Sequence, residues 1–581
     1  MGALVATLAL QILGWRLTTN WLWGASALHA WPAPGAAALV TVALIGFVPP
    51  LARGVSAWLA TLGRTWERAG VRGDLVAAGL FGVLLFSLRD TLRYVGDFDL
   101  RFNTLGLPTV TTGPLRHAYP LDLLVNVTLP RALLGSGAAS GLQLVGAVVG
   151  TCFAFVVFRF LRSAGARGAA LPAGALVVMG GALSNHFAGY DKFGPLLLGL
   201  AIAGLGAVEL AREGRGFGRL GIGATIAILS HRSGFLALPA ALWTAARAWP
   251  RAEASARARI WLAVLAPLLA AAAMLPRTVD TFLHVDRVAH LRRAAGAAPL
   301  RWIAISDAAN VLLFLVPLWL AAAACAAGAR SGVSSTPHEP VPAPRFSLAW
   351  TAALAMAPFA ALLLLVHPAG GWSRDWDDGT GAGVVAALAS AYALVGAWRA
   401  PGVSRTLAPA VTLALAVSVA LWGIHASSSM GIARLVELVR ARPQMSDASL
   451  TATLDFFGAR TLGSGHPEWA ASLFERAIAV GGANPRLLYQ AGEAYLAAGD
   501  AGRARGAFER AAALNPAYTD PWLGLARVAL AEGDTLRVAA MLDSAGARVP
   551  DDAVSRRLAR DRWLRELSRD QPSPGAVPSS P

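Results

Sequence analysis

The chain alternates between long apolar stretches and short segments that are rich in arginine and glycine. A helix needs about 20 mostly apolar residues to cross the hydrocarbon core of a bilayer, so each long stretch predicts a transmembrane helix. We expect about thirteen such spans, which makes the fold class all-α, a polytopic bundle of transmembrane helices. They lie near residues 2–18, 35–51, 74–88, 138–161, 169–185, 194–211, 219–230, 235–248, 259–275, 302–325, 347–366, 383–398 and 405–424. The pair 219–230 and 235–248 could instead form one bent or re-entrant element.

The composition agrees with a membrane protein. Of the 581 residues, 55% are hydrophobic and 14% are charged, whereas soluble domains carry about 25% charged residues. The formal net charge of +16 comes from arginines scattered through short loops, which sets membrane orientation and gives no reason to expect nucleic-acid binding. Both cysteines, Cys152 and Cys325, fall inside predicted spans. We therefore expect neither a disulfide nor a cysteine metal site.

The arginines also predict an orientation. The loops after the second, fourth, sixth, eighth, tenth and twelfth predicted spans carry them, and alternating spans put these loops on one side. Because short cytoplasmic loops are enriched in arginine and lysine, that side is the cytoplasm. The loop 276–301 is an exception, with five arginines on the opposite side. Either they bind an anionic group or the span count is off by one. The agreement of the other loops favours the first option and predicts a multi-pass protein of the inner (cytoplasmic) membrane.

The predicted outer side carries the unusual polar residues. The segment Arg89–Arg131 interrupts the apolar chain with four aspartates among five arginines. Within it, Asp97 and Asp99 stand at positions i and i+2 and would share one face of an extended segment. Such a pair could hold a divalent cation, or one acid could act as general base for an incoming hydroxyl. Arg101 follows them as a candidate contact for an anionic substrate. The alternative is a loop whose charges pair with one another in water.

Two further polar groups flank apolar runs. His231 and Arg232 lie between two of them, where charged side chains are costly unless they face a cavity, a partner or lipid headgroups. Arg232 could clamp a lipid-linked phosphate, or it could simply extend its guanidinium to the headgroups. The second group follows the eleventh span and contains His367, Arg374, Asp375 and Asp377. These residues could complete a site with the acidic loop, or form a solvated turn. A short outer loop with His186 is expected to be structural or to face headgroups.

The composition changes after the last span, and an internal repeat begins. Residues Ala470, Ala504 and Val538 recur every 34 positions, as do Phe474, Phe508 and Leu542. The segment 488–516 resembles the tetratricopeptide repeat. Its residues at the motif positions are Gly492, Tyr495, Ala504, Phe508, Ala511 and Pro516. The alanines let paired helices approach closely, the phenylalanine fills the space between them and the proline ends the second helix. Three repeats suffice for a short α-solenoid.

The membrane half resembles the polytopic glycosyltransferases of the GT-C class, because an acidic pair lies in an early loop on the predicted outer side. Protein O-mannosyltransferase-like branches of this class also carry tetratricopeptide repeats after the membrane half. The resemblance implies a polyprenyl-phosphate-linked sugar donor, with Asp97 or Asp99 as the catalytic acid. In the family this acid follows the first span, whereas here it follows the third predicted span.

We expect four regions: a GT-C-like membrane domain (1–425), a connector (426–448), a repeat domain (449–566) and a disordered tail (567–581). The expected function is extracytoplasmic glycosyl transfer, with the repeats outside the cytoplasm and binding an acceptor or partner protein. No cofactor is firmly indicated, although Asp97 and Asp99 could hold a divalent cation. Two alternatives stay open. One is a lipid-linked polysaccharide polymerase or ligase, and the other is a membrane-anchored repeat scaffold without enzymatic activity.

Overall fold

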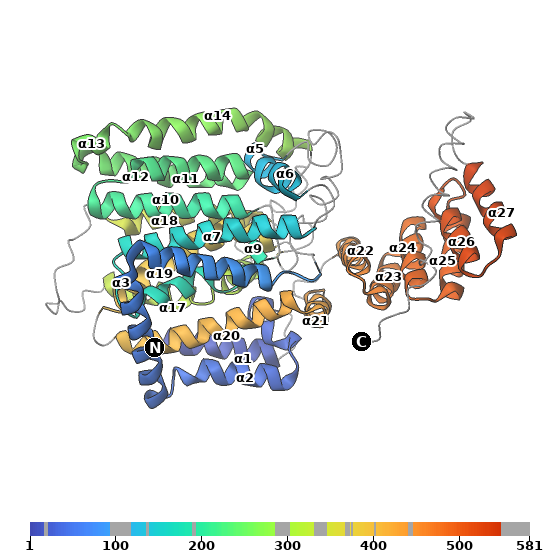
Figure 1. Ribbon diagram of the computed structural model, residues 1–581, viewed down its shortest axis with the longest axis horizontal. Helices are drawn as coiled ribbons and strands as arrows, with labels where there is room; N and C mark the ends of the chain where they lie inside the picture. The colour runs from blue at the N-terminus through green and yellow to red at the C-terminus, as the bar shows by residue number, and fades with distance from the viewer. Residues whose placement is uncertain are drawn as a thin grey trace. The chain divides into compact units, whose positions relative to one another are not determined.

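The computed structural model describes residues 1–16, 21–92, 118–134, 139–188, 193–284, 302–330, 346–366, 372, 376–399, 403–439 and 446–547, and these residues contain helices and no strand (Figure 1). The expected all-α fold class is therefore confirmed for the described part of the chain. By its internal contacts the chain divides into two compact units, Met1–Gln444 and Met445–Pro581.

The first unit contains most of the helices. Its α-helices are α1 (Gly2–Arg16), α2 (Ala33–Ile45), α3 (Pro49–Ser87), α5 (Pro120–Leu123), α6 (Leu129–Leu134), α7 (Ala139–Ser163), α8 (Ala170–Met179), α9 (Asn185–Ala188), α10 (Gly194–Glu213), α11 (Phe217–Ser230), α12 (Leu238–Ala248), α13 (Ala254–Arg257), α14 (Ile260–His284), α16 (Trp302–Leu315), α17 (Trp319–Arg330), α18 (Leu348–Leu365), α19 (Thr380–Ala397), α20 (Leu407–Ala426) and α21 (Ser428–Leu438). The 3₁₀ turns used below are η1 (Trp23–Ala25), η2 (Ala27–Ala30), η5 (Arg232–Ala237) and η7 (Trp376–Gly379).

Among the described residues, seven helices are long and apolar enough to cross a membrane. An eighth span results if Ala304–Leu315 and Trp319–Ala327, which meet at a bend of 104°, are counted together. The predicted count of thirteen is therefore not confirmed. The ranges 2–18, 35–51, 169–185, 219–230 and 235–248 form helices of 15, 13, 10, 14 and 11 residues. At a rise of 1.5 Å per residue these reach about 15–23 Å, which is less than the hydrocarbon thickness of about 30 Å.

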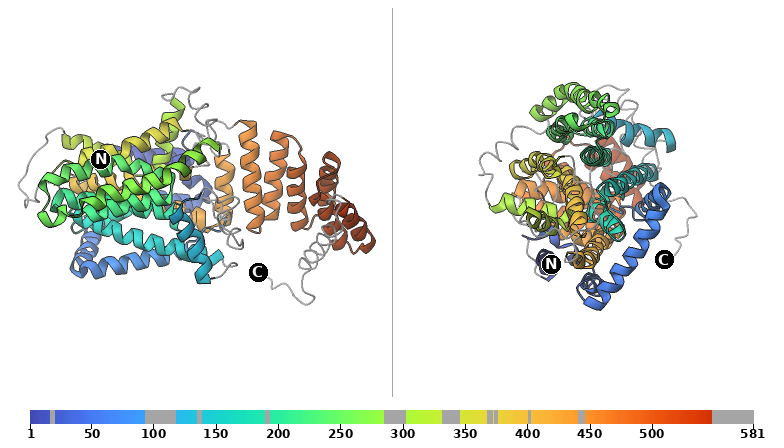
Figure 2. Two further views of the ribbon diagram at one scale, coloured as in Figure 1. Left: turned by 90° about the horizontal axis from the view of Figure 1, so that it is seen from above. Right: turned by 90° about the vertical axis from the view of Figure 1, so that its left-hand side faces the viewer.

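Several long helices of the first unit run roughly alongside one another, whereas the N-terminal part of α3, drawn in blue, runs across them (Figure 1 and Figure 2). Helix α10 is the central one, with 83% of its apolar window buried, whereas α14 and α18 are 22% buried and expose apolar side chains. Glycines allow α10 and α11 to touch. A Cβ atom on Gly206 would lie 2.4 Å from the backbone nitrogen of Leu220, and one on Gly223 would lie 2.3 Å from that of Ala203. Such small residues are typical of close helix packing in membranes.

A buried ion pair joins α3 to α7. Helix α3 is kinked at Gly70, whose φ of 57° is left-handed, and the Asp74 side chain just beyond the kink is fully buried. Arg162 of α7 donates from Nε to both carboxylate oxygens of Asp74 at 3.0 Å. Its Nη2 donates to the carbonyls of Trp66 and Gly70 at 3.0 and 3.3 Å, and Nε1 of Trp66 donates to the same carboxylate at 3.0 Å. One guanidinium thus binds both the buried carboxylate and the backbone at the kink.

Three of the arginine-bearing loops lie together. Arg399, after α19, donates to the carbonyl oxygens of Ala164 and Gly165 in the loop after α7, at 3.1 and 2.5 Å. Burial lowers the pKa of Arg399, and the nearby charges of Arg212 and Arg167 lower it further. The loops after α7, α10 and α19 therefore concentrate positive charge at one place.

The second unit consists of paired helices. They are α22 (Asp447–Gly463), α23 (Pro467–Gly481), α24 (Pro485–Ala497), α25 (Ala501–Leu514), α26 (Asp520–Ala531) and α27 (Thr535–Gly546). Phe508 of α25 is fully buried, and a Cβ on Gly492 or Gly524 would lie 2.5 or 2.6 Å from its ring. The glycines of α24 and α26 thus make room for this phenylalanine. Tyr495, Ala504 and Ala511 are also buried, and Pro516 lies in the turn after α25.

We predict that Asp74→Asn destabilises the first unit. The change leaves Arg162 buried without its counter-charge, which costs about 3–5 kcal/mol. The free energy of unfolding in detergent micelles measures the effect. As a matched control, Arg215→Ala removes an ion pair with Glu213 in which the arginine side chain is 70% exposed, and it should cost little stability, because exposed ion pairs contribute little. Equal losses for both variants would contradict the role given to Asp74.

Candidate functional site

The short helix α9 contacts several buried polar residues of the first unit. All four of its residues are buried, and it follows a turn in which Gly181 has a φ of 63°. A Cβ on Gly181 would lie 2.7 Å from the carbonyl oxygen of Leu315. The glycine is therefore needed for both the left-handed backbone and the close approach of α16. Figure 1 shows α9, α5 and α21 at the same end of the first unit.

His186 of α9 binds the turn η7, which contains the predicted residue Asp377. Its Nε2 lies 2.7 Å from Thr380 Oγ1, and the Thr380 hydroxyl donates to the Asp377 carbonyl at 2.5 Å. Because that hydroxyl has one proton, Nε2 of His186 must donate to it. The His186 ring also packs 5.1 Å from that of Trp376. His186 is 1% exposed, so it does not face lipid headgroups as one reading of the sequence had it.

A buried carboxylate approaches α9 from the opposite side. Asp90, at the end of α3, is 2% exposed, and its carboxylate lies 3.7 Å from Nδ1 of His425 in α20. The Asp90 backbone N–H donates to the carbonyl of Ala188, the last residue of α9. Just before α9, the Ser184 hydroxyl accepts a hydrogen bond from Nε1 of Trp422 at 2.5 Å. The ends of α3 and α20 are thus both attached to α9.

The predicted residues His231 and Arg232 lie next to the same group. The Phe193 ring packs 4.8 Å from the ring of His231 and 6.0 Å from that of His186. Nδ1 of His231 accepts a hydrogen bond from the backbone of Ser233, so a neutral His231 carries its proton on Nε2. Both His231 and Arg232 are partly exposed. The structure therefore brings His231 and Asp377 to one cluster, joined through Phe193 and His186.

The buried side chain of Tyr119 lies near His231 and two arginines. Tyr119, just before α5, packs 6.5 Å from the His231 ring, and its hydroxyl lies 2.5 Å from Thr278 Oγ1 of α14. Arg277 donates from Nη1 to the carbonyl of Ala118 at 2.9 Å. Burial raises the pKa of Tyr119, while the charges of Arg232 and Arg277 act to lower it. Two guanidinium groups are therefore close to one phenol.

Further buried charges extend the cluster. The Phe314 ring lies 4.8 Å from that of Trp376 and 5.7 Å from the guanidinium of Arg434 in α21. Arg434 is 3% exposed and donates to the Trp23 carbonyl at 2.5 Å. Trp23 in turn donates from Nε1 to the buried carboxylate of Asp307 at 3.3 Å. Helix α21 thus packs within the first unit, although it lies in the range 426–448 that was expected to be a connector.

Several predicted site residues lie outside the described residues, namely Asp97, Asp99, Arg101, His367, Arg374 and Asp375. Their roles stay predictions. The described residues that flank them nevertheless converge. Asp90 binds α9 before the acidic loop, Tyr119 follows that loop beside His231, and Trp376 packs on His186 after the Arg374 segment. Two predicted polar loops, the acidic loop and the Arg374 segment, therefore begin or end at one cluster.

The sequence analysis did not assign a role to Asn185, Asp307, His425 or Arg434. Asn185 is 1% exposed, and among the described residues neither of its side-chain amide atoms has a hydrogen-bond partner. A signal for Asp307 was available, because a lone acid inside an apolar run is rare and usually functional. No pattern indicates that His425 meets Asp90, since 335 positions separate them.

Among the described residues, no group of three His, Cys, Asp or Glu side chains could hold a metal ion.

Comparison with known proteins identifies only the second unit. Residues 495–560 match the family model of the tetratricopeptide repeat. This agrees with the repeat predicted from the period of 34 residues. A search of the curated proteins finds no match for the chain.

We predict that Asp90 and His425 stabilise the fold as a pair. In a double-mutant cycle with Asp90→Asn and His425→Gln, the double variant should lose less stability than the sum of the single variants, with a coupling of about 0.5–3 kcal/mol. Unfolding free energies in detergent give the coupling. Pairing His425→Gln with Arg215→Ala, at an exposed site, should give additive losses. Additivity for Asp90 and His425 as well would show that they do not interact.

Proposed function

We propose that the protein transfers a sugar from a polyprenyl-phosphate-linked donor to an acceptor hydroxyl on the extracytoplasmic face of the inner membrane. The observation that supports the proposal is the convergence at α9 of the residues flanking two polar loops, beside the partly exposed Arg232. Such a transfer needs two groups. One is a carboxylate that accepts the proton of the acceptor hydroxyl, and the other is a cation that binds the leaving phosphate. The membrane gives a lipid-linked donor direct access.

Asp97 or Asp99 would be the general base. The chain leaves the cluster at Asp90 and returns to it at Tyr119. Asp97 is five positions from Leu92 in the sequence, and five residues span at most about 18 Å, which is the reach that the proposal requires of this acid. It would take the proton of the acceptor hydroxyl as that oxygen bonds to the anomeric carbon. The bond from this carbon to the phosphate oxygen breaks, and its electron pair leaves on the phosphate. Arg101 and a divalent cation bound by the acids would be additional contacts.

Arg232 would bind the leaving phosphate. A guanidinium offers two parallel N–H donors to phosphate oxygens, and a site that excludes water strengthens the interaction. Arg277 adds a second positive charge near Tyr119. Two positive charges bind an anion at this place more strongly than either arginine would alone. His231, His367, Arg374 and Asp375 are the further substrate contacts that we propose.

The buried residues of the cluster would position the others. His186 and Thr380 are 1% and 0% exposed, so neither touches a substrate. Their hydrogen bonds instead fix the turn η7, in which Asp377 is half-buried. Asn185 has both amide atoms available within the described residues, and it would orient the acceptor or a neighbouring loop.

The repeat unit would recruit a protein. Tetratricopeptide repeats generally mediate protein–protein interaction, and stacked helix pairs form extended surfaces for it. We propose that this unit is extracytoplasmic and binds the acceptor protein or an assembly partner. Arg277 favours one alternative in particular, a lipid-linked polysaccharide polymerase or ligase, because it belongs to the arginine-rich range 276–301, whose first residues form the end of α14. A scaffold without activity is the remaining alternative.

We predict that Asp97→Ala and Asp99→Ala fail to complement a deletion strain. At matched protein levels, at least one variant should lose a glycan product from the surface-glycan and glycoprotein profiles, because the acceptor hydroxyl keeps its proton. Asp447→Ala, which removes an exposed acid at the start of α22, is the matched control and should complement fully.

Unchanged profiles in both variants and in the double variant would contradict the transferase. The scaffold alternative makes the opposite prediction. Under it, the acids are dispensable, whereas Phe508→Ala, which removes the buried ring between Gly492 and Gly524, abolishes function. Leu536→Ala in the same unit changes a side chain that is 85% exposed and controls for surface effects.

A further inference from the structure

Two arginines at one end of the first unit are held close together without an acidic partner. Arg212 lies in the last turn of α10, and Arg399 follows α19. A Cβ atom on Gly165, in the loop after α7, would meet Nη2 of Arg399 and would lie 3.2 Å from Nη1 of Arg212. Gly165 has a φ of 85°, so the left-handed backbone itself keeps this place free of a side chain. Both guanidinium groups therefore reach one point.

The donors of Arg212 are not used by the described part of the protein. Its Nε is buried and has no hydrogen-bond partner there, and its guanidinium carbon lies 5.9 Å from the centre of the Tyr392 ring. Arg399 donates to two backbone carbonyls of the α7 loop, which are uncharged. Among the described residues neither arginine has a carboxylate within ion-pair distance.

The positive charge at this place is therefore not balanced by the protein. Glu213, the neighbour of Arg212 in the sequence, pairs instead with Arg215 at 2.6 Å. Burial lowers the pKa of Arg399, and the charge of Arg212 lowers it further. Like charges held together repel each other, and an anion between them removes the repulsion.

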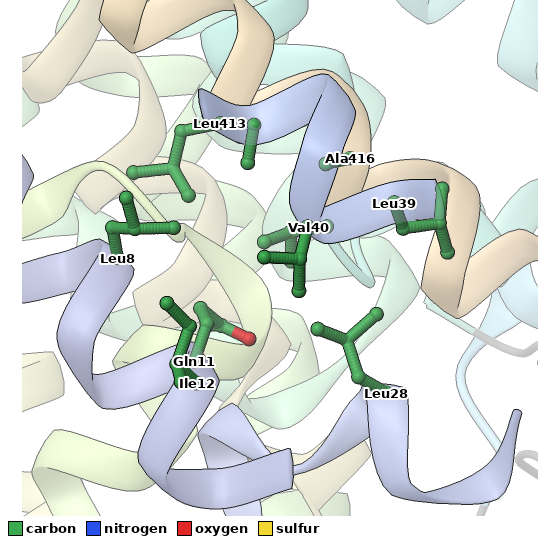
Figure 3. Close-up of a pocket in the computed structure, with 10 residues that line it drawn as sticks. Leu8, Gln11, Ile12, Leu28, Leu39, Val40, Leu413 and Ala416 are labelled. Carbon is green, nitrogen blue, oxygen red and sulfur yellow. The ribbon is translucent and has the colours of Figure 1, made fainter. Parts of the chain in front are cut away.

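A buried polar atom without a partner does not by itself indicate a ligand. Gln11 of α1 also lacks hydrogen-bond partners among the described residues. It lies beside a small space between α1, α2 and α20, which is otherwise lined by hydrocarbon side chains (Figure 3). This space has room for about one water molecule, which would satisfy the amide. Arg212 differs, because it is charged, lies beside a second cation and meets the exposed Arg399, so an anion can reach it from outside.

The geometry of the two guanidinium groups specifies the anion. Each guanidinium offers pairs of parallel N–H donors, whose spacing matches the oxygens of a phosphate or a carboxylate. A carboxylate has two oxygens, which one guanidinium occupies. A phosphate group carries more oxygens around one atom, so it can accept from both arginines at once.

The place lies at the opposite ends of α10 and α19 from the α9 cluster. Both helices begin at that cluster, since a Cβ on Gly194 would lie 3.7 Å from Phe187 and Thr380 binds His186. Both are long and apolar enough to cross a membrane, and the 20 residues of α10 span about 30 Å. The arginine distribution predicts that the far ends face the cytoplasm, where the membrane surface carries anionic lipids.

We propose that Arg212 and Arg399 together bind one phosphate group, carried by an anionic lipid headgroup or by a soluble phosphate compound. The site is independent of the proposed glycosyl transfer, because it lies about one helix length from α9 and shares no residue with the α9 cluster.

Thermal unfolding of the full-length protein in a neutral detergent tests the proposal. The probes are phosphatidylglycerol and inorganic phosphate. Their controls are phosphatidylcholine, whose headgroup is neutral, and sodium chloride at the same ionic strength. A ligand that binds the folded protein raises its unfolding temperature with concentration, which gives the dissociation constant. In the unaltered protein at least one probe should raise the unfolding temperature above its control.

Two variants separate this site from a general attraction of anions to a basic protein. Arg212→Gln should weaken binding of the stabilising probe at least about tenfold, because one of two guanidinium groups is lost. Without a probe it should be at least as stable as the unaltered protein, because it relieves the repulsion by Arg399. Arg53→Gln removes an exposed arginine of α3, which is the same charge change at another place, and should leave binding unchanged.

The two probes also identify the source of the phosphate. Tighter binding of phosphatidylglycerol assigns the site to a lipid headgroup, and tighter binding of inorganic phosphate assigns it to a soluble compound. Either result supports the proposal. It is overturned if neither probe stabilises the protein more than its control does. It is also overturned if Arg212→Gln keeps the affinity or loses stability without a probe, or if Arg53→Gln weakens binding equally.

Discussion

The first unit depends on one constraint, which is that polar groups buried among apolar helices must find partners inside the protein. The hydrogen bond between His186 and Thr380 meets this constraint at the site. It joins α9 to the start of α19, and the turn η7 is fixed between them by the Asp377 carbonyl. Because an unpaired buried group costs about 1–3 kcal/mol, each such bond determines where a helix ends, and the polar loops that begin there are held near one another.

The arginines of the first unit have two roles, and the same constraint accounts for one of them. Arg162 binds Asp74 and a backbone carbonyl at the kink of α3, and Arg399 satisfies carbonyls in the loop after α7. These contacts lie within the protein. Arg232 lies close enough to the buried phenol of Tyr119 for its charge, like that of Arg277, to act on the pKa of Tyr119, and two cations at one place attract an anion. The arginine that would bind substrate is thus distinguished by its neighbours, since the residue type is the same.

The sequence predicted what depends on local pattern. Apolar stretches of about 20 residues gave the long helices, and the spacing of Phe474, Phe508 and Leu542 gave the repeats, which a family model matches over residues 495–560. The count of thirteen spans is not confirmed, because hydrophobicity does not show where a helix breaks. The pair Asp74–Arg162 and the contact of Asp90 with His425 join distant positions, which no periodicity encodes. His186 was assigned to a surface loop because its partner Thr380 lies 194 positions away.

We propose that Arg232 and the residues around α9 form the site of sugar transfer from a lipid phosphate. The most direct measurement is donor turnover by the purified protein in lipid nanodiscs, with a polyprenyl phosphate that carries a radiolabelled sugar. If the protein transfers the sugar, it should release one polyprenyl phosphate for each glycosylated product that forms. We also predict that Arg232→Gln lowers kcat/KM at least about 30-fold, which corresponds to about 2 kcal/mol of transition-state stabilisation. A folded protein that releases no lipid phosphate, or an Arg232→Gln variant with unchanged kcat/KM, would contradict the proposal.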